Sequence, residues 1–186
     1  MDTLHKLEEF FRNFPGIGPR QAKRFAYYLL TLQDQDLQQF AKHITDLKQS
    51  VHTCTLCQRY FPLNSSRSTD ICTICSDPNR DTSTLMIVSR DIDMQAVERS
   101  RAYDGVYFVL GGSVPILEEK PETKIRQKEL TERVTSLVST GLKEIIIATS
   151  VNPEGEHTAS YIAGLLKPLV GAHGFRVSTL GRGLST

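Results

Sequence analysis

Two Cys-x-x-Cys pairs constrain this chain more than any other feature, because they contain every cysteine that it has. The pairs are Cys54 with Cys57 and Cys72 with Cys75, and residues 58–71 separate them. A spacing of this kind lets two tight turns each present two thiolates to the same metal ion. Four thiolates leave no open position for water or substrate, so the sequence predicts a structural zinc ion that holds a small fold together.

The cysteines have other conceivable uses: two disulfides, a redox-active pair, or four unrelated buried thiols. Residues 1–13 alternate charged and apolar side chains and do not form an apolar signal sequence, and no apolar run approaches the length of a membrane span. We therefore expect a cytoplasmic protein without membrane contact, and disulfides seldom persist in that compartment. His52 is an alternative metal ligand, although with four thiolates available it is more simply a neighbouring polar residue.

Composition limits the function classes without choosing among them. The chain has 186 residues, of which 39% are hydrophobic, so it can build one ordinary domain or two small ones. Its formal net charge is +1. Contact with nucleic acid must therefore come from a local basic patch or from the backbone, because the molecule as a whole is not a polycation.

The spacing of apolar residues and the cysteine pairs divide the chain into three stretches. We predict a helical domain at 1–52, a four-cysteine zinc finger at 53–80 and an α/β domain at 81–186. In the first stretch the apolar residues recur at helical spacing, and three short helices packed together would bury them. These residues are Leu4, Leu7, Phe11, Phe14, Ala22, Phe25, Ala26, Leu29, Leu30, Leu37, Phe40, Ala41, Ile44 and Leu47.

The third stretch alternates short apolar runs with helical patterns. Strands are predicted at 85–88, 106–110, 145–148 and 175–180, and helices at 93–101, 124–139 and 156–170. Continuous apolar strands joined by amphipathic crossovers imply a parallel sheet covered on both faces. Ligands gather at the carboxyl ends of such strands, which here are residues 89–93, 111–115 and 149–156.

A second motif lies within the helical stretch. In Phe14-Pro15-Gly16-Ile17-Gly18-Pro19-Arg20, a tight Gly-x-Gly turn separates two predicted helices, and Pro19 suits the first position of the second helix. This order is typical of a helix-hairpin-helix motif. Glycine lets the backbone approach a phosphate closely, and amides at the start of the next helix can donate to its oxygens.

The predicted DNA-binding residues of this hairpin are Gly16, Gly18, Arg20, Lys23 and Arg24. The three basic side chains would add an attraction to neighbouring phosphates that depends on salt and not on base sequence. The alternative is a simple turn between packed helices, with the basic residues as solvated surface.

A helix-hairpin-helix, a four-cysteine knuckle and a parallel α/β domain, in this order, resemble the RecR family of bacterial recombination mediators. The resemblance extends to Val109-Leu110-Gly111-Gly112, to Pro153-Glu154-Gly155-Glu156 and to residues 180–184. It implies that the third domain is a Toprim domain, that the protein forms a ring-shaped dimer or tetramer able to clasp DNA, and that it acts with RecO and RecF. Such complexes help to load recombinase at single-stranded gaps.

The chain departs from the family pattern in two places. Toprim domains usually carry a glutamate after the first strand and an Asp-x-Asp after a later one, whereas Ser89-Arg90 and Thr149-Ser150 stand here. Phosphoryl transfer needs clustered carboxylates to hold Mg²⁺, and the acidic residues that remain nearby are Asp91, Asp93, Glu154 and Glu156. Family sequences also continue beyond the position of Thr186 through another strand and a helix.

Two weaker patterns have simpler structural interpretations. Gly111-Gly112-Ser113 follows a strand, but no P-loop pattern is present, so a tight strand exit is expected. Glu154, Glu156 and His157 could form a metal or acid/base cluster, yet carboxylates here would also suit the first turn of a helix. The mixed charges at 120–133 are predicted to be the solvated face of a crossover helix.

The sequence thus predicts a non-catalytic DNA-repair protein in the cytoplasm, associated with the nucleoid, with structural Zn²⁺ and without Mg²⁺. Its partners would be the DNA backbone, RecO, RecF and further copies of itself. One alternative is a Mg²⁺-dependent Toprim enzyme, such as a nuclease or a primase-like phosphoryl transferase. Another is a zinc-bearing adaptor between proteins that never touches DNA.

Overall fold

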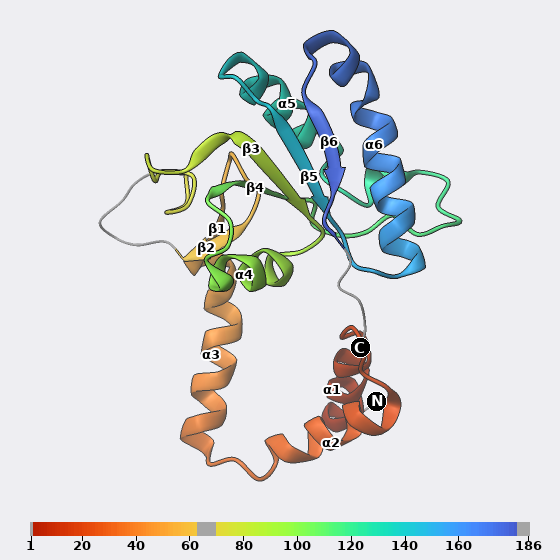
Figure 1. Cartoon of the computed structure of the whole chain (residues 1–186). Coiled ribbons are helices and arrows are strands. Elements are labelled where there is room, and N and C mark those ends of the chain that lie inside the picture. The colour runs from red at the N-terminus through yellow and green to blue at the C-terminus, as the bar shows by residue number, and fades with distance from the viewer. Residues whose placement is uncertain (1, 63–69, 182–186) are drawn as a thin grey trace. The chain divides into compact units, whose positions relative to one another are not determined.

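The computed structural model describes residues 2–62 and 70–181. Its internal contacts divide the chain into two compact units, Met1–Ser50 and Val51–Thr186. The first unit is entirely helical and the second contains the strands, which can be followed in Figure 1. Within the described residues, no helix is both long enough and apolar enough to cross a membrane.

Three helices form the first unit: α1 (Thr3–Arg12), α2 (Pro19–Leu29) and α3 (Asp34–Ser50). The Asp2 side chain caps α1 by accepting from the amide of His5 at 2.9 Å, and Pro19 occupies the first turn of α2. Helices α1 and α2 pack together, with Phe11 meeting Phe25 edge to face at a centroid distance of 5.7 Å. Ala22 and Ala26 of α2 are fully buried.

The expected burial of all three apolar stripes is wrong for the third helix. Helix α3 buries none of its residues, and Leu37, Phe40, Ile44 and Leu47 are exposed. These side chains do recur at helical spacing, but no other described element of the chain covers them fully. Phe14, predicted to be in the core, is also 54% exposed.

The second unit begins with a small antiparallel hairpin, β1 (Val51–Thr53) with β2 (Tyr60–Pro62). It continues through a four-stranded sheet that is parallel, as predicted, and has the strand order β4-β3-β5-β6. The strands are β3 (Asp81–Val88), β4 (Gly105–Val109), β5 (Glu144–Ala148) and β6 (Arg176–Thr179). All five residues of β4 are buried, and so are the last four of β3, which explains their continuous apolar runs.

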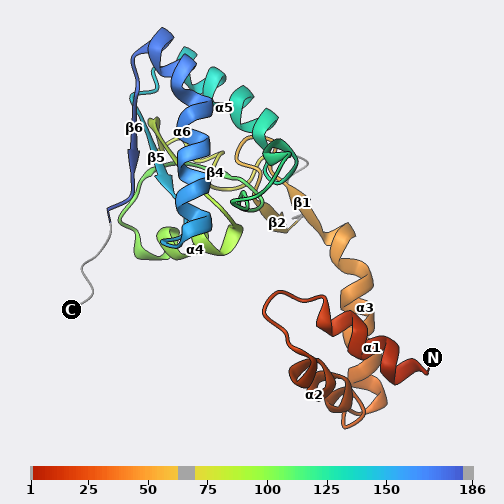
Figure 2. The ribbon, with the colours of Figure 1, turned by 90° about the vertical axis from the view of Figure 1, so that its right-hand side faces the viewer.

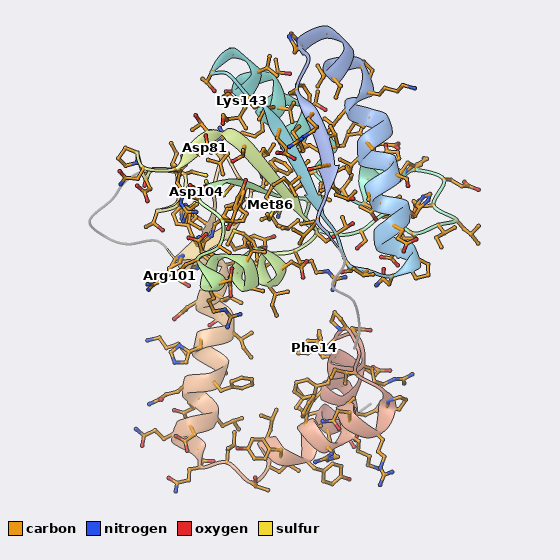
Figure 3. The ribbon with its side chains drawn as sticks, viewed as in Figure 1. Phe14, Asp81, Met86, Arg101, Asp104 and Lys143 are labelled. Atoms are coloured by element: carbon orange, nitrogen blue, oxygen red, sulfur yellow. The ribbon has the colours of Figure 1, made fainter. Side chains whose placement is uncertain are left out.

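The crossovers are α4 (Asp91–Ser100), the short 3-10 helix η1 (Pro121–Thr123) with α5 (Gln127–Ser139), and α6 (Pro153–His173). Alternate strand residues enter two separate cores. Leu85, Ile87 and Phe108 pack with side chains of α5 and α6, which Figure 2 shows near each other. Met86 and Tyr107 point to the other face, where they meet Met94 of α4 (Figure 3 labels Met86).

Candidate metal centre and nucleic-acid interface

The four cysteines come together as the spacing predicts. One sulfur atom from each of Cys54, Cys57, Cys72 and Cys75 lies within 4.8 Å of the other three. Tetrahedral zinc with Zn–S bonds of about 2.3 Å needs sulfur atoms about 3.8 Å apart, and Cys57 Sγ lies 3.6 Å from Cys72 Sγ. The cluster therefore fits a metal ion of zinc's size and ligand preference.

Two tight turns build this cluster. In the first, the amide of Gln58 donates to the carbonyl of Cys54 at 2.9 Å, and Gln58 adopts a left-handed backbone with φ 62°. In the second, the amide of Ser76 donates to the carbonyl of Cys72 at 3.0 Å. The amide of Cys72 also donates to Cys54 Sγ at 3.3 Å, so the two turns contact each other directly.

The electrostatics of the cluster favour a bound cation. The pKa of Cys54 lies below its ordinary value, chiefly because the Cys57 thiol donates to it. The same contact holds the pKa of Cys57 above its ordinary value, and burial raises it further. Four thiolates this close repel one another, so all of them ionise together only when a metal ion compensates their charge.

His52 lies outside the thiol cluster. It is on β1, and its Nδ1 is 3.9 Å from a carboxylate oxygen of Asp70. Among the described residues, the four cysteines form the one cluster of His, Cys, Asp or Glu side chains that could hold a metal ion.

The predicted hairpin lies between α1 and α2. Gly16 has φ 76°, a conformation that side chains other than glycine rarely adopt, and no atom would obstruct a Cβ at Gly18. The amides of Gly16, Gly18 and Arg20 have no acceptor in the part of the chain that the structure describes. These are donors of the kind that bind a phosphate at a helix start.

The basic residues predicted with the hairpin all lie on the solvent side of α2. Arg20, Lys23 and Arg24 are exposed. Arg24 donates to the Gln21 side chain at 3.3 Å, and Lys23 Nζ lies 5.6 Å from the centroid of the Tyr27 ring. Helix α2 contains these three cations and no acidic residue.

The carboxyl edge of the parallel sheet carries the residues that stand where the family resemblance predicts carboxylates. Ser89 follows β3 and is buried. The nearby acids have structural partners: Asp91 accepts from the amide of Tyr60 at 2.8 Å, and Asp93 accepts from the amide of Arg90 at 3.0 Å. Each carboxylate thus bonds to a backbone amide through one oxygen, Asp91 joining β2 to the start of α4 and Asp93 capping α4.

The acids at the start of α6 occupy its first turn. Glu154 and Glu156 lie there behind the N-cap residue Asn152, whose side chain accepts from the amide of Gly155 at 2.7 Å. This is the helix-capping arrangement that the sequence suggested as the simpler interpretation. Gly155 is required here, because a Cβ would lie 2.0 Å from the carbonyl oxygen of Ser150.

Sequence reasoning missed the residue that joins the knuckle to the sheet. Arg126, at the start of α5, donates to the carbonyls of Gln58 at 2.5 Å and Val109 at 3.2 Å and to the Tyr60 hydroxyl at 3.3 Å. The sequence had placed it in a solvated charge run. Its partners are remote in sequence, so no local pattern could have indicated them.

Comparison with known proteins agrees with this organisation. Residues 4–48 match the family model described as RecR, helix-hairpin-helix, and residues 83–181 match the model of the Toprim domain. The N-terminal match contains the hairpin, and the C-terminal match contains the parallel sheet.

Curated relatives match along almost the whole chain. "Recombination protein RecR" of Staphylococcus aureus (strain JH9) is 37% identical over 184 residues, which are 99% of this chain and 86% of the relative. The protein of the same name from Lactococcus lactis subsp. cremoris (strain MG1363) is 35% identical over the same share of each chain. That of Lactobacillus acidophilus is 35% identical over 185 residues. With the hairpin, the thiol cluster and the Toprim sheet in the family's order, this chain belongs to the RecR family.

Proposed function

We propose that this protein is a non-catalytic DNA-binding factor of recombinational repair that grips the DNA backbone through its hairpin. The observation that carries the proposal is the hairpin itself: the amides of Gly16, Gly18 and Arg20 have no acceptor among the described residues, and they lie at the start of a helix with three cations and no acidic residue. Amides and cations together recognise phosphate without reading bases. The match of this segment to the RecR hairpin model supports the same assignment.

The further parts of the proposal concern partners and metal. We infer that the four thiolates hold structural zinc, that copies of the chain associate into a clamp, and that the clamp acts with RecO and RecF at gapped DNA. Zinc is supported by the sulfur spacing, and the partners by family membership. In this chain Arg90 stands where an acidic Toprim residue is expected, so contact with RecO would have to tolerate a reversed charge.

The magnesium-enzyme alternative is disfavoured by the residues at the sheet's carboxyl edge. Ser89 and Thr149 stand at the positions where the family resemblance predicts carboxylates. A two-metal phosphoryl transfer needs several carboxylates directed at the ions. The DNA titration described next distinguishes the adaptor alternative from DNA binding.

The test is fluorescence anisotropy of a labelled gapped duplex, titrated with protein over a range of salt concentrations. Lys23→Glu should weaken binding by roughly tenfold for every DNA sequence. It should also make the slope of log affinity against log salt concentration shallower by about one or more, because fewer counterions are released. Lys167→Glu is the matched control, since it makes the same charge change at an exposed position of α6. Equal affinity of Lys23→Glu and wild type would reject the hairpin as the phosphate grip.

The adaptor alternative predicts a different outcome of the same titration. It requires that the wild-type protein bind no DNA even at low salt. If binding appears only after the cognate RecO is added, the hairpin assignment is tested by comparing Lys23→Glu with wild type in that complex.

A further inference from the structure

The outer face of α2 combines positive charge with exposed aromatic rings. Its inner face packs on α1 through Ala22, Phe25 and Ala26. Because residues three and four apart share a helix face, the side chains that remain outward form one continuous surface. They are Arg20, Lys23, Arg24, Tyr27 and Tyr28, and all of them are exposed.

The charge of Arg20 is unfavourable for the helix that carries it. Arg20 lies in the first turn of α2, where the helix dipole favours acidic side chains and disfavours cations. The neighbouring helices mix their charges, with Glu8 and Glu9 in α1 and Asp34 and Asp36 in α3, whereas α2 has no acid. An acid-free cationic surface is complementary to a polyanion.

The two tyrosines have exposed rings. Tyr27 is 48% exposed and Tyr28 is 61% exposed. Among the described residues neither ring pairs with another aromatic ring, and Lys23, whose Nζ lies 5.6 Å from the centroid of the Tyr27 ring, is the one residue in a cation–π contact with them. Nucleic-acid bases stack readily on such rings, and cations beside them hold the sugar-phosphate backbone.

We propose that Tyr27 and Tyr28 form a stacking site for the unpaired bases of single-stranded DNA. This rests on the proposed DNA binding and deepens it by naming the strand type. Tyr27 lies two turns beyond Arg20, about 10 Å along the helix axis at 1.5 Å per residue. A strand whose phosphate is bound at the hairpin can therefore reach the rings within a few nucleotides, and bases stacked inside a duplex cannot.

A protein partner is the competing occupant of this surface. Tyrosine and arginine are common in protein interfaces, but lysine is depleted from their cores. Lys23 stands in the middle of this surface, and unbonded hairpin amides adjoin it. Both features favour a nucleic acid.

The test compares a labelled oligothymidine with a fully paired duplex by fluorescence anisotropy. Tyr27→Leu with Tyr28→Leu keeps apolar side chains of good helix propensity but removes both rings. We expect this double variant to bind oligothymidine about tenfold more weakly or worse, with duplex affinity unchanged within about twofold. Tyr27→Phe with Tyr28→Phe keeps the rings and should retain binding, and so should the control Phe10→Leu, which changes a 67% exposed ring on α1.

A spectroscopic test reads the stacking directly. The chain contains no tryptophan, so Tyr27→Trp introduces a single indole. Addition of oligothymidine should quench the indole fluorescence, because thymine stacks on the ring. Addition of duplex should leave the fluorescence nearly constant.

The outcomes separate this proposal from the one on which it rests. If Lys23→Glu weakens binding while the leucine variant binds both DNAs as wild type does, the hairpin grip stands and the stacking site is rejected. An equal loss of affinity for single-stranded and duplex DNA in the leucine variant also rejects the stacking site. Dissociation of a wild-type oligomer in the leucine variant, with DNA affinity kept, would assign this surface to a second copy of the chain. Absence of binding to either DNA, both for the protein alone and with the cognate RecO added, would overturn both proposals.

Discussion

At the scale of single residues, Arg126 connects three parts of the chain that are distant in sequence. Its guanidinium bonds to the carbonyls of Gln58 and Val109 and to the Tyr60 hydroxyl, and it lies 5.4 Å from the centroid of the Tyr60 ring. Space for it depends on Gly111, where a Cβ would approach the Arg126 side chain to 3.2 Å. A planar fork of donors can satisfy these acceptors together, and a lysine ammonium cannot.

Replacing Arg126 by methionine should therefore destabilise the second unit by about 2 kcal/mol, because charged hydrogen bonds to half-buried acceptors are lost. Arg126→Lys should recover only part of this loss. The measurement is the urea midpoint of the metal-loaded protein. Lys128→Met is the control, since Lys128 is 86% exposed in a 4.0 Å ion pair with Glu132 and should shift the midpoint little. An equal midpoint shift for both variants would contradict this role of Arg126.

At the scale of elements, the thiol cluster is part of the core of the α/β unit. Cys54, Cys57 and Cys72 are buried against Met86 and Tyr107 of the sheet. The amide of Val109 donates to the carbonyl of Cys57 at 2.8 Å, so the edge strand β4 is bonded to the first cysteine turn. The thiol cluster thus covers one face of the sheet together with α4.

Removing the metal should loosen the sheet as well as the knuckle. We expect a strong chelator, or Cys57→Ser, to release zinc and to increase amide hydrogen exchange in β4, which loses its contact with the cysteine turn. Exchange within α6 should change less, because its buried residues Ile162 and Leu166 belong to the opposite core. Full zinc stoichiometry in Cys57→Ser would exclude the four-thiolate site, and unchanged exchange in β4 would show that the knuckle opens independently.

The elements also show which parts of the fold were predictable from sequence. The parallel strands were found because burial on both faces leaves continuous apolar runs, and the thiol cluster because its ligands lie in short local pairs. Helix α6 starts before the predicted Glu156, at Pro153, because Asn152 caps it. The contacts of Arg126 and the exposure of α3 could not be predicted, since both depend on which elements meet in space.

At the scale of the whole molecule, we propose that copies of the chain associate through the exposed apolar side chains of α3. Leu37, Phe40, Ile44 and Leu47 recur on one stripe and are between 37% and 59% exposed. A helix that is stable in water normally buries such a stripe, and exposed contiguous apolar surface marks an interaction site. A second copy of the chain is the occupant that our proposed clamp requires.

Ile44→Lys should therefore lower the association state of the protein, because it places a charge in the centre of the stripe, where desolvation in an interface is costly. Sedimentation velocity over a range of protein concentrations measures this. Gln38→Lys is the matched control, since it adds the same charge to α3 on the side away from the stripe. Thermal melting at low concentration should be unchanged in both variants, because neither position is buried. An oligomer that Ile44→Lys leaves intact would exclude α3 as the contact through which copies of the chain assemble, and the clamp would then have to close through the α/β unit. A wild type that stays monomeric at all concentrations would reject self-association itself.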